Sequence, residues 1–334
     1  MEKVKYIEIT NFKSIKHLEI NDCNTINVFI GMPNAGKSNI LEALGLFGKI
    51  NNPSISPEIK LEDIIRFKRY SELFFEENFN YQIGVRINKI LIEVYPKALL
   101  GWGYELFNLN NDLNFSNSNL KLPIDNGLKL HHLSEIKKYQ FVNTSFRESE
   151  NNIVLDYPSG KNLVQIISTN PKLRKIVNQL FNMNNLKLLI EKHTNELKIF
   201  KEYQDGTVFT LPYELVADTL QRLIFYEAAI ISNKNSILLF EEPEAHCFEP
   251  YILEFTNAVK YDENNNQFFI VTHSDYIIKE FLRDEETKEN TNLYLVNNIN
   301  GETKVKLLDK NKNEDVYELG MNPFFNFENL WENN

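Results

Sequence analysis

One segment near the start of the chain constrains its fold more than any other. Residues 31–39 read GMPNAGKSN, in the G-x-x-x-x-G-K-[ST] pattern of a phosphate-binding P-loop. The segment follows a strand-like run at residues 26–30 (INVFI) and opens a helix-like run at residues 38–46 (SNILEALGL). Glycines let the backbone wrap so that successive N–H groups point at one centre, where the helix N-terminus also favours an anion. The sequence therefore predicts a polyphosphate site on a strand–loop–helix unit.

Two side chains of this segment carry the chemistry of a nucleotide site. Lys37 can reach the β- and γ-phosphates as a point charge, and the Ser38 hydroxyl is placed to ligate Mg²⁺. The rest of the loop completes the cradle. The residues that we expect to bind the nucleotide are Gly31, Pro33, Asn34, Ala35, Gly36, Lys37, Ser38 and Asn39.

Acidic residues follow an apolar run about two hundred positions later. Residues 236–244 read SILLFEEPE, which is typical of a buried parallel strand that delivers Glu241 and Glu242 to the ligand-binding edge of an α/β sheet. In hydrolysis Glu241 would hold Mg²⁺, and Glu242 would orient or deprotonate the attacking water. The alternative is an acidic surface turn, but a P-loop enzyme requires a second, acidic strand of this kind.

A histidine ends the next buried-strand pattern. Residues 266–275 read NQFFIVTHSD, and a strand here, parallel to the acidic one, would place His273 at the same sheet edge. A histidine after a strand is often structural. Its position in the sheet favours the functional interpretation, in which His273 lies within reach of the γ-phosphate.

Composition limits the class of protein. The 334 residues can hold one large domain, or one domain with a substantial insertion, and 43% hydrophobic with 25% charged residues is typical of a soluble globular protein. We expect no membrane partner and a cytoplasmic location, because no apolar run reaches about 20 residues and the start MEKVKYIEI is no signal peptide. Cys23 and Cys247 lack metal-ligand spacing and indicate a reducing compartment. The net charge of −10 argues against a uniformly basic nucleic-acid surface, although a local patch stays open.

The remaining patterns predict mostly antiparallel strands and short helices. Arg66, Lys68 and Arg69 lie in a segment at 50–75 that we expect to be a loop with a short helix, and a solvated face is favoured over contact with phosphate or a partner. The other expectations are a hairpin at 3–9 and 15–20, a meander at 80–110, an Asn-rich flexible loop or insertion edge at 108–119, a short helix after Pro171, and a hairpin at 186–203 with His193 near its turn. His131, His132 and His193 show no metal-ligand spacing.

A long helix is predicted at residues 211–233, from apolar residues at helical spacing that include Leu215, Leu220 and Leu223. Asp218 and Thr219 fall near its start. Asp218 either caps the helix or faces a nucleotide on a second protomer.

Together these motifs, with the opening ITNFKSIKHLEI, resemble the ABC-type ATPases of the OLD, RecF and SMC group, and most closely the compact prokaryotic AAA family ATPases of OLD type. The resemblance covers residues 1–50 and 210–282 well, and 51–209 loosely. It implies that Gly36, Lys37 and Ser38 form Walker A, that Glu241 and Glu242 form Walker B, and that His273 is the switch histidine. It also implies ATP and Mg²⁺ as cofactors, and heads that dimerise with two ATP molecules between a P-loop and the partner's signature helix.

The chain departs from this group in three ways. Glu241 stands where aspartate is usual, and the signature region VADTLQR has no glycine pair, so a composite site across a dimer is left open. Only about sixty residues follow His273, which leaves no room for the TOPRIM nuclease of full OLD enzymes. These residues predict two strands, NLYLV and KVKLL, and an exposed aromatic tail that we expect to contact a partner: Phe324, Phe325, Phe327 and Trp331.

The sequence thus predicts an α/β P-loop NTPase of ABC/SMC-like type, with antiparallel N-terminal strands, a parallel core sheet flanked by helices, and an inserted α+β lid. The expected core is residues 1–75 and 205–334, and the expected lid is 76–204. By resemblance, ATP-dependent self-association, as a homodimer or higher oligomer, would regulate a separately encoded nuclease or toxin in bacterial anti-phage defence. The alternatives are a RecF-like DNA-binding repair ATPase and a non-hydrolysing nucleotide-dependent scaffold. A transporter subunit is disfavoured, because the glycine-bearing signature is missing.

Overall fold

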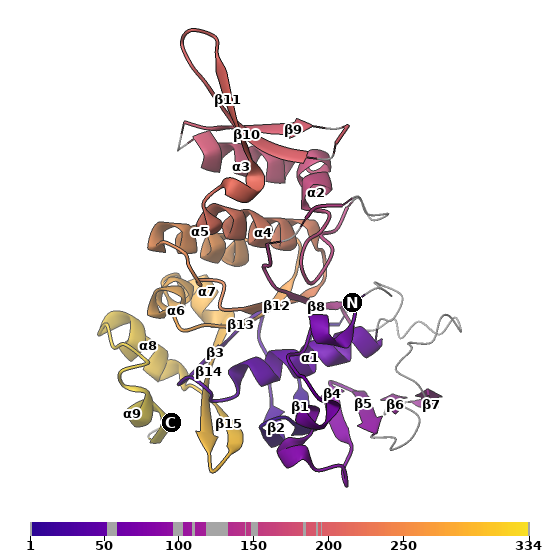
Figure 1. Ribbon diagram of the computed structural model, residues 1–334. Helices are drawn as coiled ribbons and strands as arrows, with labels where there is room; N and C mark the ends of the chain where they lie inside the picture. Colours follow the sequence, from indigo (N-terminus) through magenta and orange to yellow (C-terminus); the bar gives the residue numbers. More distant parts are fainter. Residues whose placement is uncertain are drawn as a thin grey trace. The chain divides into compact units, whose positions relative to one another are not determined.

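The computed structural model describes residues 2–51, 59–95, 103–108, 111–117, 133–143, 145–147, 153–182, 185–191, 193–194 and 196–332 (Figure 1). His131 and His132 lie outside the described residues. Contacts divide the chain into two compact units. The first unit is Met1–Lys138, Asn235–Glu242 and Gln267–Asn334, and the second unit is Tyr139–Lys234 and Pro243–Asn266.

These boundaries differ from the predicted core and insertion. Residues 76–138, expected in the lid, group with the first unit, because their strands pair with the N-terminal hairpin. Residues 205–234, expected in the core, group with the second unit. That one part of the chain is an ATPase core and another part a lid stays a prediction.

The first unit contains an antiparallel sheet in the order β2-β1-β4-β5-β6-β7. Its strands are β1 (Ile7–Phe12), β2 (Ile15–Ile20), β4 (Ile83–Ile87), β5 (Ile90–Tyr95), β6 (Gly103–Asn108) and β7 (Asn111–Asn117). The predicted hairpin and meander are confirmed, and they join into one sheet. The prediction of a flexible loop at 108–119 is wrong for residues 111–117, which form strand β7. Backbone hydrogen bonds to β6 hold this strand, and an Asn-rich composition does not reveal such pairing.

A second sheet of the first unit carries the core, in the order β15-β14-β3-β13-β12-β8. Strand β3 (Ile26–Ile30) lies between β13 (Gln267–Val271) and β14 (Thr291–Ile299) and is parallel to both. Strand β12 (Ile237–Glu241) is parallel to β13, as the sequence predicted. Strands β8 (Ile136–Tyr139) and β15 (Glu302–Leu307) form the two edges. Strands β3 and β13 are fully buried, which explains why they read as continuous apolar runs.

Helix α1 (Lys37–Asn51) follows β3 and is almost entirely buried. The helix continues past residues 38–46, the run from which the sequence predicted it. A Cβ atom on Gly48 would come within 2.6 Å of the Ile136 carbonyl oxygen, so the glycine permits close packing on the start of β8.

Short helices complete the first unit. The segment at 50–75, expected as a loop with a short helix, contains the 3-10 turns η2 (Leu61–Asp63) and η3 (Tyr70–Leu73), and η4 (Phe75–Glu77) follows. The remaining helices are α6 (Asp275–Leu282), α7 (Glu285–Glu289), α8 (Lys310–Glu318) and α9 (Phe327–Glu332).

The second unit combines helices with a three-stranded antiparallel sheet, as Figure 1 shows. The predicted hairpin is β9 (Lys187–Glu191) and β10 (Glu196–Glu202), with His193 in the turn, and β11 (Val208–Pro212) pairs with β10. The helices are α2 (Leu163–Thr169), α3 (Pro171–Asn182), η5 (Tyr213–Leu215), α4 (Asp218–Ser232) and α5 (Glu249–Lys260).

The long helix predicted from residue 211 begins only at Asp218. Residues up to Pro212 pair with β10 as part of strand β11. Leu215, which the prediction placed on the buried face of the helix, is 67% exposed. Asp218 does not cap the helix, since Ala217 occupies the N-cap position without a side-chain bond. The Asp218 carboxylate instead accepts a 2.6 Å hydrogen bond from Arg222 Nε.

Within the described residues, every helix falls short of the combined length and apolar character that crossing a membrane requires.

Candidate active site

The P-loop lies between β3 and α1 in the first unit, and two of its residues have left-handed backbone. Asn34 has φ +61° and Gly36 has φ +95°, so the chain curls back on itself as a phosphate cradle requires. Gly31 is needed for a steric reason, because a Cβ atom there would lie 2.1 Å from the Val296 carbonyl oxygen on β14. A Cβ atom on Gly36 would lie 1.9 Å from Thr303 Oγ1. The loop therefore packs closely against the neighbouring strands β14 and β15.

A chain of polar side chains ties the loop to two other elements, and the sequence motifs missed two of its members. The Thr303 hydroxyl of β15 donates to the Ala35 carbonyl at 3.1 Å and lies 2.6 Å from Ser14 Oγ, in the turn between β1 and β2. Asn39 Nδ2 donates to Ser14 Oγ at 2.6 Å. Thr303 is fully buried. Thr303 lies in no motif, and Ser14 lies in the opening ITNFKSIKHLEI, for which the sequence predicted no contact with the loop. Only the tertiary structure brings these two hydroxyls to the loop.

Lys37 is 4% exposed, although it is a lysine at the start of a helix. Its Nζ atom donates to the carbonyl oxygens of Gly31 and Met32, both at 2.9 Å. Buried charges need partners of this kind. The ammonium group is thus held at the mouth of its own loop.

Ser38 and Glu241 come together as the motif spacing predicted. The Ser38 hydroxyl lies near the Glu241 carboxylate, whose side chain is 16% exposed. Burial alone would raise the pKa of Glu241, but the Lys138 ammonium, the Ser38 hydroxyl and the Arg66 guanidinium outweigh it and hold the pKa below its ordinary value. An ionised carboxylate beside a hydroxyl is an oxygen donor set that fits Mg²⁺.

The Glu241 carboxylate belongs to a larger ionic cluster. Lys138 Nζ lies 3.2 Å from Glu241 and 4.0 Å from Glu42, whose side chain is completely buried on α1. Arg66 donates to Glu42 through Nε at 2.9 Å and to Glu241 through Nη2 at 2.8 Å. Lys13 also pairs with Glu42. Three cations surround two carboxylates, so the cluster carries a net positive charge next to the P-loop.

Arg66 therefore differs from the solvated face that its segment predicted. Its side chain is 62% exposed, but its guanidinium bridges two acids of the site. Arg69 does follow the prediction, since it is 68% exposed and pairs with Glu72 and Glu77. Lys138 lies in no recognisable motif, and Lys13 lies in the opening ITNFKSIKHLEI, for which the sequence predicted no role in the site.

Glu242 and His273 lie side by side at the carboxyl ends of β12 and β13. Glu242 has φ +46°, a strained conformation for a non-glycine residue, and its N–H donates to the Val271 carbonyl at 2.8 Å. His273 Nε2 lies 3.5 Å from Glu242 Oε1. Burial and the Lys37 charge lower the pKa of His273, and the Glu242 charge opposes them. The imidazole is therefore held towards its neutral form.

Asp218 and Thr219 belong to the second unit, where the Thr219 hydroxyl donates to the His246 carbonyl at 2.8 Å. Their predicted part in an ATP site supplied by a second protomer stays a prediction.

The aromatic tail is only partly exposed, contrary to the sequence prediction. Phe325 is 92% exposed, but Phe327 is 3% exposed. Trp331 is anchored to β15, since Lys306 Nζ donates to its carbonyl at 2.6 Å and lies 4.9 Å from the centre of its ring. A run of aromatic residues did not reveal that the last helix buries some of its side chains.

Similarity to solved structures supports the fold. An SMC head bound to the C-winged helix domain of ScpA aligns with a TM-score of 0.53 and 14% identity, over 93% of this chain and 99% of that chain. A second SMC head, from Pyrococcus furiosus, aligns with a TM-score of 0.50 over 96% and 99%. At this identity the likeness concerns the fold, and it confirms the predicted P-loop ABC/SMC-type architecture.

Two relatives align with most of this chain. An "ATP/GTP phosphatase" of Helicobacter pylori is 23% identical, over 87% of this chain and 91% of that protein. The "DNA replication and repair protein RecF" of Caldanaerobacter subterraneus is 25% identical, over 86% and 69%. A family model described as "AAA domain, putative AbiEii toxin, Type IV TA system" matches residues 26–279, which include the P-loop, both acids and His273. The chain belongs to this AAA-domain family.

Proposed function

We propose that this protein binds ATP with Mg²⁺ and hydrolyses it to ADP and phosphate. The observation that carries the proposal is the meeting of Ser38 with Glu241, beside the pair formed by Glu242 and His273. This arrangement brings the phosphate loop to the acidic strand, as hydrolysis requires. The name of the Helicobacter pylori relative, an ATP/GTP phosphatase, supports nucleoside triphosphate hydrolysis.

Each group has a distinct role in this proposal. Lys37, held at the loop mouth by two carbonyls, would move its charge onto the β- and γ-phosphates. Ser38 and Glu241 would hold Mg²⁺, which when bound neutralises charge on the phosphates. Glu242 would orient or deprotonate the attacking water, and the adjacent His273 would contact the γ-phosphate. The positive cluster around Arg66 and Lys138 would favour the approach of an anion.

Glu242→Gln tests hydrolysis. We expect this variant to bind ATP as tightly as the natural protein and to lose turnover by roughly 10²- to 10⁴-fold, because the amide cannot accept the water proton. Glu285→Gln is the matched control, since Glu285 is 87% exposed on α7, and it should leave turnover unchanged. Phosphate release and ATP binding would be measured separately. ATP binding without turnover in the natural protein would favour the nucleotide-dependent scaffold, and equal turnover in the natural protein and in Glu242→Gln would contradict the role given to Glu242.

We further propose that ATP drives self-association and that the assembly regulates a separately encoded nuclease or toxin in anti-phage defence, in the cytoplasm. The family description, which names the AbiEii toxin and a type IV TA system, supports a link to toxins. The SMC head with ScpA bound supports partner binding by this fold. Light scattering of Glu242→Gln with and without Mg·ATP tests assembly, and an unchanged mass would contradict it. Phe325, at 92% exposure, is the tail residue best placed for an effector contact, which Phe325→Ser should weaken in co-purification.

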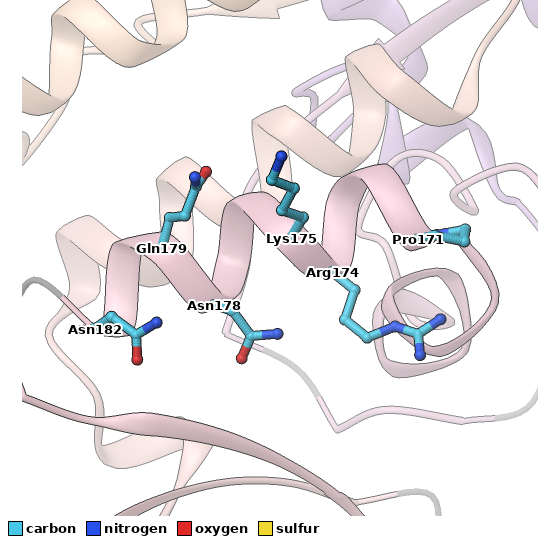
Figure 2. A pocket seen from close by; sticks show the side chains of 6 residues that line it. All are labelled: Pro171, Arg174, Lys175, Asn178, Gln179 and Asn182. Carbon is cyan, nitrogen blue, oxygen red and sulfur yellow. The ribbon is translucent and has the colours of Figure 1, made fainter.

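A second candidate function is DNA binding of the RecF kind, and one observation favours it. Helix α3 has the sequence PKLRKIVNQLFN, without an acidic residue, in a chain of net charge −10. Six residues of this helix line an open pocket of about 570 Å³. Figure 2 shows their side chains: Pro171, Arg174, Lys175, Asn178, Gln179 and Asn182. Guanidinium, ammonium and amide groups are the ones that contact phosphates and base edges in DNA.

Duplex DNA distinguishes the two functions. DNA binding predicts ATP turnover that rises with added duplex and an affinity that falls steeply with salt. Arg174→Glu combined with Lys175→Glu should abolish both effects. A regulator of a protein effector should show neither effect, and its basal turnover should survive the double substitution.

A further inference from the structure

The ring of Phe324 stacks on the imidazole of His273. The two ring centres are 6.1 Å apart and the planes are inclined by 28°. His273 follows strand β13 at the candidate active site, whereas Phe324 lies just before α9, near the end of the chain. The end of the sequence thus supplies a side chain that touches the predicted γ-phosphate contact.

Two other groups act on the same imidazole. Glu242 Oε1 lies 3.5 Å from Nε2, and the charge of Lys37 also reaches the ring. The His273 side chain is 35% exposed, so the acid and the lysine do not enclose it. The Phe324 ring lies against the imidazole in an offset stack, which limits rotation about the His273 side-chain bonds.

Phe324 is itself held firmly. Its backbone N–H donates to Asn322 Oδ1 at 2.9 Å, and the Asn322 carbonyl accepts from the Asn326 N–H at 3.1 Å, which closes a tight turn. Immediately after this turn, α9 buries Phe327 at 3% and Leu330 at 4% exposure. An exposed chain end would not hold a ring in one place, but an end anchored in this way can.

We propose that Phe324 is a positioning residue for His273, whose ring fixes the imidazole plane so that Nε2 stays at the place where the γ-phosphate and the attacking water meet. The inference rests on the proposed function, because it takes His273 as a γ-phosphate contact. Phe324 touches neither nucleotide nor water in this role and acts only through His273.

Neighbouring residues provide matched variants. Phe325 has the same side chain, follows Phe324 directly and is 92% exposed, so Phe325→Ala controls for the loss of a tail ring. Phe324→Leu keeps apolar bulk without a ring, and Phe324→Tyr keeps the ring. Comparison of Phe324→Leu with Phe324→Tyr separates ring stacking from apolar packing. This comparison holds even if Phe324→Ala destabilises the tail.

Two measurements test the proposal. For ATP hydrolysis, we expect kcat to fall roughly threefold to tenfold in Phe324→Ala and Phe324→Leu with KM unchanged, since an aromatic pair contributes this much. Phe324→Tyr should retain the natural rate, and so should Phe325→Ala, because the assay contains no effector protein. In NMR spectra of the nucleotide-free protein, the His273 ring signals, assigned with His273→Asn, should lose their ring-current shift only in the Ala and Leu variants of Phe324.

Three outcomes would overturn the proposal. The first is an unchanged kcat in Phe324→Leu, and the second is an equal loss in Phe325→Ala. The third is a Tyr variant as slow as the Leu variant. Absence of turnover in the natural protein would overturn the proposed function as well. A normal natural rate with an unaffected Leu variant would overturn the positioning role alone.

Discussion

The Ser38 hydroxyl at the start of α1 meets the Glu241 carboxylate at the end of β12 and helps to keep it ionised. The two residues lie in distant parts of the sequence and meet because β12 and β3 run in the same direction on either side of β13. Their carboxyl ends therefore share one edge of the sheet. A hydroxyl and an ionised carboxylate at that edge form the oxygen pair on which the proposed metal site depends.

Removal of the Ser38 hydroxyl should weaken metal-dependent nucleotide binding. We expect Ser38→Ala to reduce the affinity for Mg·ATP about tenfold, which corresponds to roughly 1.4 kcal/mol, with little change in the absence of metal. Ser38→Thr is the control, because threonine is accepted in the motif and keeps the hydroxyl. Titration with a fluorescent ATP analogue over a magnesium series measures both. A loss of equal size without magnesium would contradict the assignment of Ser38 to the metal.

Thr303 should contribute to ATP binding without touching the nucleotide. Thr303→Val removes the hydroxyl that bonds Ala35 and contacts Ser14, while leaving the shape of the side chain nearly unchanged. We expect ATP to bind threefold to tenfold more weakly, since a lost buried hydrogen bond costs about 1 kcal/mol and loosens the loop. Thr303→Ser should bind normally. Calorimetry would measure the affinity of the Val and Ser variants for ATP. Equal affinities would show that the Thr303 hydroxyl does not contribute to ATP binding.

Glu42 should be essential for stability. Glu42→Gln leaves Lys13, Arg66 and Lys138 with one carboxylate fewer at a completely buried position. Breaking a buried ionic network in this way costs roughly 3 to 5 kcal/mol. Urea unfolding would measure the loss, and Glu285→Gln on the exposed face of α7 should change stability by less than about 0.5 kcal/mol. Similar midpoints for the two variants would contradict the network's role.

Glu227 should make stability fall with rising pH. Burial in the second unit, reinforced by Glu254 and partly offset by Lys172, raises the pKa of Glu227 from 4.5 to about 8. The folded state thus keeps a proton that the unfolded state releases, so stability is greatest below pH 4.5 and is lost as pH rises through 8. Glu227→Gln cannot titrate. We expect it to match the natural protein near pH 4.5 and to be more stable by roughly 2 to 4 kcal/mol at pH 8.

Unfolding curves at several pH values check this expectation. Glu254→Gln, at the exposed neighbour that reinforces the shift, should reduce the pH dependence without removing it. Parallel pH profiles for the natural protein and Glu227→Gln would show that the carboxyl group ionises normally in the fold.

The tail should divide into an anchoring residue and an exposed one. Phe327→Ala should destabilise the protein by roughly 3 kcal/mol, because the ring is 3% exposed and its removal leaves a cavity. Phe325→Ala, at 92% exposure, should change stability by less than about 0.5 kcal/mol. Thermal unfolding of the two variants tests the assignment, which would fail if both melted alike.

Local patterns were sufficient for the elements that carry the chemistry. The boundaries of β3 matched its apolar run, and β12 and β13 appeared where the sequence placed them, because strands covered on both faces must be apolar throughout. The motif spacing also anticipated the contact between Ser38 and Glu241 and the proximity of Glu242 to His273. Predictions failed where pairing overrode composition, in the strand β7 and in the late start of α4.

The sequence by itself determined that a phosphate loop, two acids and a histidine would share one sheet edge, because a P-loop with parallel apolar strands permits few other arrangements. Only the tertiary structure decided which groups surround them. Lys138, Arg66 and Thr303 reach the site from elements with no motif of their own, and Phe324 reaches His273 from the end of the chain. Contacts of this kind depend on how separate elements pack, and no local spacing of residues encodes them.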